Sequence, residues 1–236
     1  MVGKITTFET MGSADGPGIR LVLFLNGCLL RCKYCHNPET WCGGGDIKEI
    51  SAEEVLNLYN KYKIYYGDKG GVTFSGGEPL LQSDFVLETA KLLKQNGIHI
   101  AIDTSGVAEN YQEVLELADL VILDVKAVDE DEYKFITGKD MTLFNNFIKD
   151  CQRLHKKLWL RQVIVPGIND NEEHILKLKN FASSLQGVEI ERIELLPYHS
   201  MAKSKYEKLG IKYPLDGVID MPKDKLQELQ ELISLL

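Results

Sequence analysis

The stretch Cys28-Leu-Leu-Arg-Cys32-Lys-Tyr-Cys35 places three cysteines within one short loop, directly after the apolar run Leu21–Leu25. Gaps of three and two residues allow a loop without regular structure to turn three sulfur atoms toward one point. A 4Fe–4S cluster has four irons and is usually held by four cysteines. Three close cysteines without an obvious fourth therefore predict a cluster with one open iron, to which a substrate or cofactor can bind. Gly27 gives the backbone the freedom to turn into this loop.

The spacing of the cysteines leaves two alternatives open. One is a structural zinc site with Cys42 or His36 as the fourth ligand, because zinc also accepts four cysteines or three cysteines and a histidine. The other is a set of thiols that hold no metal. We expect the two remaining cysteines, Cys42 and Cys151, to be ordinary thiols without a function.

The bulk composition is that of a soluble globular chain. Of 236 residues, 44% are hydrophobic and 26% are charged, which is close to the average. The net charge of −8 argues against a general nucleic-acid binder. No apolar stretch reaches the roughly 20 residues of a membrane span, and the N-terminus has no signal-peptide pattern. With three of its five cysteines in one loop, the chain does not have a disulfide framework, so we expect a cytoplasmic protein.

Apolar runs that favour strands alternate with helical patterns along the chain. The runs are nearly continuous, as in strands that are buried on both faces, and the alternation predicts an α/β fold with a parallel sheet and outer helices. The predicted strands are Arg20–Leu25, Gly71–Phe74, His99–Ile102, Leu120–Val125, Leu158–Val165 and Arg192–Leu196.

Several signals mark the ends of helices. Ser51 with Glu54 has the pattern of a capping box, and Asn110 with Glu113 is a weaker form of it. Gly97 and Gly106 stand where an element ends and a permissive backbone is needed. The last predicted helix, over residues 223–236, has Leu226, Leu229, Ile233 and Leu236 on one face and should pack against the body.

Polar motifs follow five of these strands, where α/β folds bind their ligands. The cysteine loop follows the first strand, Ser75-Gly-Gly-Glu78 the second, and His199 the last. The third and fourth strands end at Asp103 and Asp124. Because the carboxyl ends of parallel strands meet at one edge, these five motifs are predicted to form one site.

Two of these motifs have a chemical interpretation of their own. Gly76 and Gly77 let backbone atoms approach a ligand closely, and the carboxylate of Glu78 can fix an amine; an ordinary turn is the alternative. Asp124 and Lys126 are two residues apart, so their side chains share one face of a strand. Charged groups inside an apolar strand are costly unless they are used, but a structural ion pair is also possible.

The motifs together resemble those of radical S-adenosylmethionine enzymes, and among these the activating enzymes of glycyl-radical enzymes of the pyruvate formate-lyase type. The resemblance runs from about Ile5 to the last helix, and the absence of a cysteine-rich insert between Trp41 and Ser51 favours this type. It is carried by Asp15-Gly-Pro-Gly-Ile-Arg20, the cysteine loop with Tyr34-Cys-His-Asn37, Ser75-Gly-Gly-Glu78, Asp103-Thr104, Asp124-Val-Lys126 and Leu195-Leu-Pro-Tyr-His199.

This resemblance implies one domain over residues 1–236, folded as a partial (β/α)6 barrel that is open at one side. Cys28, Cys32 and Cys35 would hold a 4Fe–4S cluster and act in catalysis. Asp103 and Asp124 would also hold a monovalent cation near the cofactor, and Asp15 and Arg161 would contact the substrate loop of a partner protein. The residues implied in S-adenosylmethionine binding are Tyr34, His36, Gly76, Gly77, Glu78, Asp103, Asp124, Val125, Lys126 and His199.

The activity implied by the resemblance is reductive cleavage of S-adenosylmethionine, followed by removal of a hydrogen atom from a glycine Cα. The partner would be a glycyl-radical enzyme, first of all pyruvate formate-lyase, and a flavodoxin- or ferredoxin-like protein would supply the electron. We expect a monomer. The alternatives are activation of another glycyl-radical enzyme, radical chemistry on a small molecule, and a cluster-bearing binding module or sensor without turnover.

Overall fold

The computed structural model describes residues 1–42 and 46–234, and of Cys42 and Ser234 only the backbone. The chain divides into two compact units: Met1–Leu29 with Thr40–Ile122, and Leu30–Glu39 with Leu123–Leu236. The prediction of one domain over residues 1–236 stays a prediction, since two compact units can belong to one domain.

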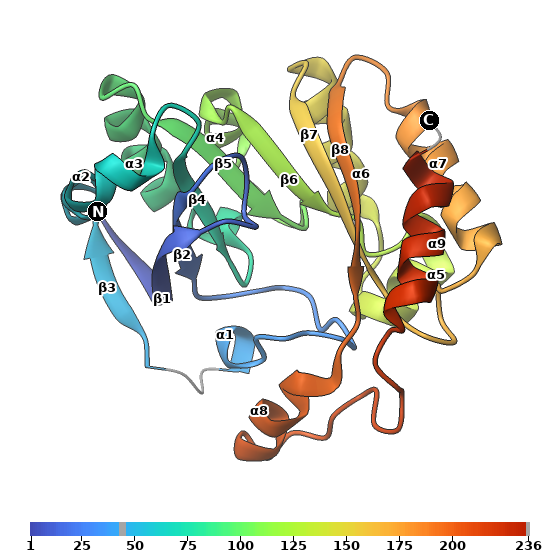
Figure 1. The fold of residues 1–236 in the computed structure, drawn as a ribbon. Coiled ribbons are helices and arrows are strands. Elements are labelled where there is room, and N and C mark those ends of the chain that lie inside the picture. The colour runs from blue at the N-terminus through green and yellow to red at the C-terminus, as the bar shows by residue number, and fades with distance from the viewer. Residues whose placement is uncertain (43–45, 235–236) are drawn as a thin grey trace. The chain divides into compact units, whose positions relative to one another are not determined.

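Five strands of the first unit lie in the order β3-β1-β2-β4-β5 (Figure 1). The strands β2, β4 and β5 run parallel, while β1 is antiparallel to both β2 and β3. Strand β6 carries the chain across the boundary between the units. These strands are β1 (Val2–Gly12), β2 (Arg20–Leu25), β3 (Lys48–Ser51), β4 (Gly71–Gly76), β5 (His99–Thr104) and β6 (Leu120–Asp124).

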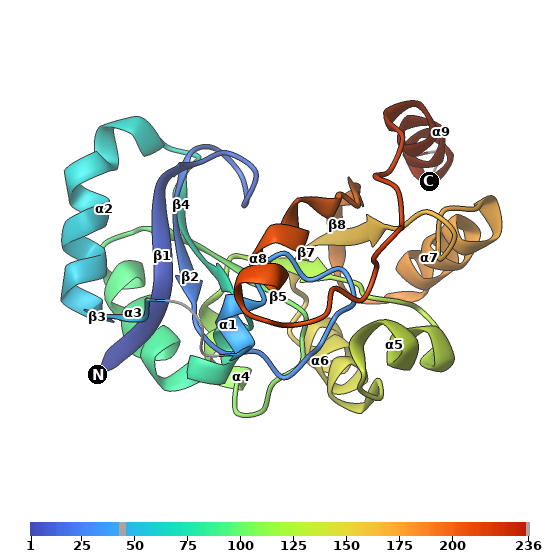
Figure 2. The same ribbon diagram turned by 90° about the horizontal axis from the view of Figure 1, so that it is seen from below.

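Helices α2, α3 and α4 pack beside one another in the first unit, and α2 and α3 also lie against its strands (Figure 2). The predicted capping box is confirmed at the start of α2, where Ser51 accepts from the Glu54 N–H and Glu54 accepts from the Ser51 N–H. The helices are α1 (Glu39–Cys42), α2 (Ala52–Tyr66), the 3-10 turn η1 (Pro79–Gln82), α3 (Ser83–Gln95) and α4 (Gln112–Leu117).

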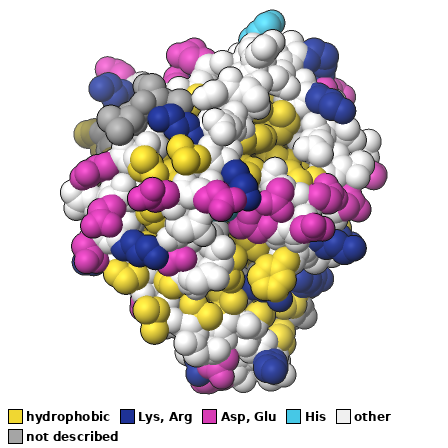
Figure 3. All heavy atoms as spheres, turned by 90° about the vertical axis from the view of Figure 1, so that its right-hand side faces the viewer, with side chains coloured by type: hydrophobic (Ala, Val, Ile, Leu, Met, Phe, Trp, Pro, Cys, Tyr) yellow, Lys and Arg dark blue, Asp and Glu magenta, His cyan; other side chains and the backbone are white. Residues whose placement is uncertain are grey.

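The second unit is built on the parallel pair β7 (Lys157–Ile164) and β8 (Glu189–Pro197). The face that carries α7 and α9 has acidic and basic side chains interspersed with apolar ones (Figure 3). None of the helices that the structure describes is long and apolar enough to cross a membrane. The helices are α5 (Glu130–Thr137), α6 (Thr142–Arg153), α7 (Glu172–Ser184), the 3-10 turn η2 (Ser200–Ala202), α8 (Lys203–Lys208) and α9 (Lys223–Ser234).

The six predicted strands are confirmed, and so is the α/β class with a mostly parallel sheet and flanking helices. Two antiparallel strands, β1 and β3, were not predicted. The register of β1 against β2 shifts between Ile5 and Thr7 and again between Glu9 and Gly12. Such irregularities interrupt the period of two by which a strand is recognised in a sequence. Strand β3 is too short for this period to be recognised.

One predicted helix cap is wrong. The residue before α4 is Tyr111, which makes no side-chain cap hydrogen bond, and Asn110 has a φ of 57°. Asparagine is one of the few residues that adopt this left-handed conformation readily, so Asn110 belongs to the turn. Gly97 and Gly106, with φ values of 68° and 70°, do end elements as expected.

Helix α9 covers part of the edge of β8. The side-chain amide of Gln230 accepts a hydrogen bond from the Leu195 N–H at 2.8 Å and donates to the Ile193 carbonyl at 3.1 Å. It thereby satisfies the groups that a neighbouring strand would bind. Leu229 and Ile233 of the same helix are buried, which confirms its apolar face, and Leu236 lies outside the described residues.

Candidate active site

The cysteine loop starts in the first unit, where the ends of β2 and β4 are tied together. The φ of Gly27 is 106°, and its N–H donates to the Thr40 carbonyl at 2.8 Å. The backbone N–H groups of Gly77 and Glu78 donate to the carbonyls of Leu25 and Gly27, at 2.9 and 2.7 Å. The segment before Cys28 is therefore held directly against the Ser75–Glu78 motif.

The rest of the loop lies in the second unit, anchored to the end of α5. The backbone N–H groups of Arg31 and Lys33 donate to the carbonyls of Thr137 and Ile136, at 2.9 and 3.0 Å. A turn follows, in which the Cys35 N–H donates to the Cys32 carbonyl at 3.0 Å. The loop thus has a defined backbone between two of the three predicted cluster ligands.

The three cysteines come from both units, Cys28 from the first and Cys32 and Cys35 from the second. None of them forms a disulfide, and neither does Cys151, whereas the side chain of Cys42 lies outside the described residues. Within the described residues, no group of three His, Cys, Asp or Glu side chains is gathered as a ready metal site. The three cysteines are therefore assigned as cluster ligands from their spacing and from the similarity to known proteins.

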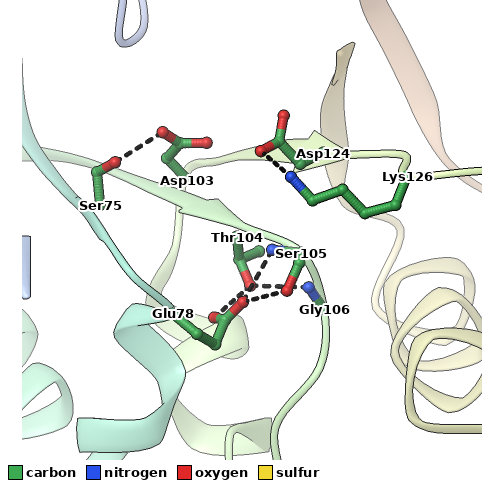
Figure 4. Close-up of polar contacts among 8 residues, drawn as sticks. All are labelled: Ser75, Glu78, Asp103, Thr104, Ser105, Gly106, Asp124 and Lys126. Carbon is green, nitrogen blue, oxygen red and sulfur yellow. Dashed lines mark hydrogen bonds and ion pairs between the residues drawn. The ribbon is translucent and has the colours of Figure 1, made fainter. Parts of the chain in front are cut away.

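Glu78 has a different role from the one its motif suggests. Its carboxylate is fully buried and accepts four hydrogen bonds. Three come from the Ser105 N–H and from the hydroxyls of Thr104 and Ser105 (Figure 4), and the fourth comes from the Leu80 N–H. Burial raises the pKa of Glu78, while the hydrogen bonds from Ser105 and Thr104 oppose this shift. The sequence predicts a direct contact between this side chain and an amine. In the structure, both of its oxygens are instead hydrogen-bonded to groups of the protein.

The two glycines before Glu78 are required by packing. A Cβ at Gly76, where φ is 121°, would lie 2.3 Å from the backbone of Leu25. A Cβ at Gly77 would lie 2.1 Å from the Gly27 carbonyl oxygen. Their freedom from a side chain therefore lets the ends of β4 and β2 touch.

Ser75, just before these glycines, orients a carboxylate at the end of the next strand. Its hydroxyl donates to Asp103 Oδ2 at 2.7 Å (Figure 4). Asp103 is the fifth residue of β5 and is half-buried. This places one of the predicted strand-end carboxylates in a fixed orientation.

In the second unit, Lys126 and Asp124 form a close ion pair, with 2.7 Å between Nζ and Oδ2 (Figure 4). The Lys126 side chain is only 12% exposed. Burial opposes its charge, but the carboxylate of Asp124, together with Tyr34 and Cys32, outweighs burial and raises the pKa of Lys126. Val125, between the pair, is buried and its N–H donates to the Arg161 carbonyl at 2.8 Å.

Tyr34 lies next to this ion pair, with Lys126 Nζ 5.7 Å from the centre of its ring. The side chain is 5% exposed, and its hydroxyl is buried without a hydrogen-bond partner among the described residues. Burial also raises the pKa of Tyr34. A buried polar group without a partner is costly, so this hydroxyl indicates a place where a ligand group belongs.

His36 and His199 are in contact, with ring centres 4.0 Å apart and His36 Nε2 3.2 Å from the His199 carbonyl oxygen. Burial and the adjacent His199 ring lower the pKa of His36. His199 Nδ1 is a second buried polar atom without a partner in the described part of the chain. The pair thus offers one more hydrogen-bonding atom to a ligand.

These features fit the cofactor set that the sequence predicts. Thiolates suit an iron–sulfur cluster, and a buried ammonium, a phenol and an imidazole nitrogen suit the carboxylate and nucleoside of S-adenosylmethionine. The zinc alternative with His36 as a ligand is not favoured, since His36 is engaged with His199. Ser105, Glu39 and Lys205 were missed by the sequence analysis, because their contacts depend on the fold. Thr104 and Asn37 belong to motifs that the sequence analysis quotes, but it assigns them no role.

Lys205 holds the end of the cysteine loop in place. Lys205 of α8 donates to Asn37 at 3.0 Å and forms an ion pair with Glu39 at 2.7 Å. A lysine more than 150 residues away in the sequence carries no motif that would reveal this contact.

The two predicted substrate-loop residues lie in different units. The Asp15 carbonyl accepts a hydrogen bond from the Thr73 hydroxyl at 2.7 Å, and the Asp15 side chain is half-buried. Arg161 of β7 is 7% exposed and pairs with Glu194, with 3.2 Å between Nε and Oε2.

Comparison with known proteins identifies relatives for the whole chain. Residues 22–181 match the model of the radical SAM superfamily, a span that includes parts of both units. A pyruvate formate-lyase-activating enzyme from Clostridium pasteurianum is 48% identical over 99% of this chain and 98% of its own length.

Solved structures have the same fold. A domain of a pyruvate-formate lyase-activating enzyme from Bacteroides vulgatus is 26% identical, with a TM-score of 0.54 over 70% of this chain and 93% of that one. Streptococcus suis SuiB bound to its precursor peptide SuiA is 20% identical, with a TM-score of 0.66 over 93% of this chain and 46% of that one. The likeness to SuiB shows the fold alone, and it agrees with the expected open, barrel-like sheet.

Proposed function

Because the chain belongs to the radical SAM superfamily and to the family of pyruvate formate-lyase-activating enzymes, we propose how its residues perform that activity. It is an enzyme that cleaves S-adenosylmethionine reductively and activates a glycyl-radical enzyme, pyruvate formate-lyase first of all. The observation that carries this conclusion is the 48% identity to an activating enzyme over nearly the full length of both chains.

When bound, the 4Fe–4S cluster would supply the electron for reductive cleavage of S-adenosylmethionine, the chemistry that leads to removal of a hydrogen atom from a glycine Cα of the partner. Cys28, Cys32 and Cys35 are the three protein ligands. The protein contributes binding, orientation and exclusion of water around this chemistry.

The buried polar groups have distinct tasks in this proposal. The ammonium of Lys126 binds the carboxylate of the methionine moiety, with Asp124 keeping that ammonium charged. The hydroxyl of Tyr34 and Nδ1 of His199 gain hydrogen bonds to the cofactor that they do not make to any described residue, and His36 supports His199. Supported by these contacts, the cofactor is oriented before the reaction begins, which removes an entropic part of the barrier.

In the first unit, the backbone around Gly76 and Gly77 takes the amine of the methionine moiety. The side chain of Glu78 braces this backbone through Thr104 and Ser105. Asp103, oriented by Ser75, would join Asp124 in holding a monovalent cation.

The partner is recognised as a protein, through a loop that contains the target glycine. Asp15 and Arg161 contact this loop. A glycine is suited to hydrogen-atom removal because no side chain shields its Cα. A flavodoxin- or ferredoxin-like reductant, a monomeric state and a cytoplasmic location complete the proposal.

The test uses protein purified without oxygen and reconstituted with iron and sulfide. We expect a brown protein whose reduced-cluster electron paramagnetic resonance signal changes when S-adenosylmethionine is added. With pyruvate formate-lyase present, a glycyl-radical signal and one equivalent of 5′-deoxyadenosine per radical should appear. The matched variants are Cys32→Ala, which should lose the cluster iron, and Cys151→Ala, which should keep it.

Two results would contradict the proposal at different levels. A colourless protein with one bound zinc, or a cluster signal indifferent to S-adenosylmethionine, would exclude the radical chemistry. Cleavage of S-adenosylmethionine without a glycyl radical on pyruvate formate-lyase would keep the chemistry and exclude this partner. Other glycyl-radical enzymes would then be tested in the same assay.

A further inference from the structure

Arg20 is a buried arginine, and its contacts cannot be predicted from its place in the sequence. It is the first residue of β2, and Ile19 separates it from the Asp15-Gly-Pro-Gly18 segment of the loop between β1 and β2. Its side chain is 0% exposed. A fully buried charge is costly unless it is hydrogen-bonded, so the position calls for an explanation.

The guanidinium binds neutral acceptors from three segments. Nε donates to the Thr73 hydroxyl at 2.6 Å, Nη1 to the Pro17 carbonyl at 3.0 Å and Nη2 to the Val72 carbonyl at 2.8 Å. Nη2 also lies 3.2 Å from His99 Nδ1 and 3.4 Å from the His99 carbonyl oxygen. Burial lowers the pKa of Arg20 to about 10, so the group is still charged at neutral pH.

Two of these contacts end on the Asp15–Gly18 loop. One is direct, from Nη1 to the Pro17 carbonyl. The other passes through Thr73, whose hydroxyl accepts from Arg20 and donates to the Asp15 carbonyl at 2.7 Å. Arg20 therefore fixes the two backbone carbonyls on either side of Gly16.

The glycines of the loop fit the same arrangement. Gly16 has a φ of 129°, and a Cβ there would lie 2.9 Å from Arg20 Cδ and Nε. Gly18 has a φ of 70°, and a Cβ there would lie 2.8 Å from the Gly70 nitrogen. Glycine at position 16 lets the loop pack against Arg20. Glycine at position 18 lets it pack against Gly70, just before β4.

From this geometry we propose that Arg20, acting through Thr73 and the Pro17 carbonyl, is a positioning residue that shapes the Asp15–Gly18 loop for the glycine-bearing loop of the partner protein. This inference rests on the proposed function, in which Asp15 contacts that loop. Arg20 touches neither cofactor nor reacting atoms. Its loss should therefore weaken the use of the protein substrate and spare the cleavage of S-adenosylmethionine.

The decisive variant is Thr73→Val, because valine has nearly the same shape and strand preference but no hydroxyl. Thr73→Ser is the matched control that keeps the hydroxyl, and Arg20→Lys keeps the charge but has fewer donors in a different geometry. Two rates are measured on the reconstituted enzyme: 5′-deoxyadenosine formation with dithionite and no partner, and glycyl-radical formation at varied pyruvate formate-lyase concentration.

We expect Thr73→Val and Arg20→Lys to raise the KM for pyruvate formate-lyase about tenfold, the size of effect that a lost hydrogen-bond network produces. Partner-free formation of 5′-deoxyadenosine should stay within about twofold of the native rate, and Thr73→Ser should restore the native KM. An unchanged KM in Thr73→Val, or a parallel fall of both rates, would overturn the proposal.

A second measurement separates this inference from the proposed function. Deuterium exchange of peptides covering residues 12–19 should be faster in Thr73→Val than in the native protein and in Thr73→Ser, with exchange in β5 unchanged. This readout does not depend on catalysis. If pyruvate formate-lyase is not activated by the native protein, the exchange result still decides whether Arg20 and Thr73 hold the loop, and equal exchange in all variants would refute it.

Discussion

Ser105 donates twice to the same atom of Glu78, through its backbone N–H at 2.9 Å and through its hydroxyl at 2.6 Å. Leu80 and Thr104 bind the other oxygen of the carboxylate. A glutamine at position 78 must place its NH2 group against one of the two backbone N–H donors. We therefore expect Glu78→Gln to lower the free energy of unfolding by about 1–3 kcal/mol.

Urea unfolding of the cluster-free protein measures this loss. The control is Glu113→Gln, whose side chain is 71% exposed and forms an ion pair with Lys91, so its effect should be small. Equal stability of the two variants would show that Glu78 does not brace the strand ends.

Tyr34→Phe should have opposite effects on the cofactor-free and cofactor-bound proteins. The Tyr34 hydroxyl is buried without a partner among the described residues, so its removal should leave the cofactor-free protein equally stable or slightly more stable. If the hydroxyl binds S-adenosylmethionine, the variant should bind it several-fold more weakly. Thermal unfolding and calorimetric titration of the reconstituted protein give the two values. A variant that is less stable and binds the cofactor normally would assign the hydroxyl a structural role.

Asp119 should make stability depend on acid pH. Burial raises its pKa, but the hydrogen bonds from Lys94 Nζ and the Ile100 N–H prevail, and the pKa of Asp119 in the folded protein lies below its usual value of 3.8. The unfolded chain therefore takes up the proton first as the pH falls, and the stabilisation is lost below pH 3.8. Asp119→Asn should be less stable than the native protein at pH 7, by about 1 kcal/mol because the pair is partly exposed.

The gap between Asp119→Asn and the native protein should close when urea unfolding is repeated below pH 3.8. A gap that is constant with pH would mean that the charge of Asp119 contributes nothing, and that the substitution acts through packing.

Cys151 should be unreactive in the folded protein. Its side chain is fully buried in α6, and burial raises the pKa of its thiol to about 12, so almost no thiolate forms at pH 8. Iodoacetamide should modify Cys151 only after unfolding, as peptide mass spectrometry of the cluster-free protein would show. Rapid modification of Cys151 in the folded protein would contradict this burial, and loss of cluster iron in Cys151→Ala would contradict its lack of function.

The sheet of the parallel strands could be predicted from sequence because each is a run of apolar residues long enough to be recognised alone. Strand β1 could not be predicted, because its bulges interrupt the alternation of buried and exposed residues. Asn110 was assigned to a helix cap instead of a turn, because turns and caps favour the same residues. The strand-end motifs were found for the same reason as the strands: their positions follow directly from where each apolar run stops.

The roles inside the site depended on contacts that only the fold determines. Nothing in Ser75-Gly-Gly-Glu78 indicates whether the carboxylate faces a ligand or Thr104 and Ser105, which come about 26 residues later. Lys205 and Arg20 are further cases, since their partners lie on other elements. The spacing of Asp124 and Lys126, in contrast, predicted that the two side chains lie together, and they do form an ion pair, although β6 ends at Asp124.

The contact of Gln230 with the backbone of β8 bears on how the protein behaves at high concentration. An exposed strand edge is a template on which a second molecule can add a strand and begin to aggregate. Gln230 occupies the Leu195 N–H and the Ile193 carbonyl, and Pro197, at the end of the same strand, has no N–H to offer. Helix α9 therefore hinders other copies of the chain from adding strands to this edge. A chain shortened before Gln230 would be expected to self-associate.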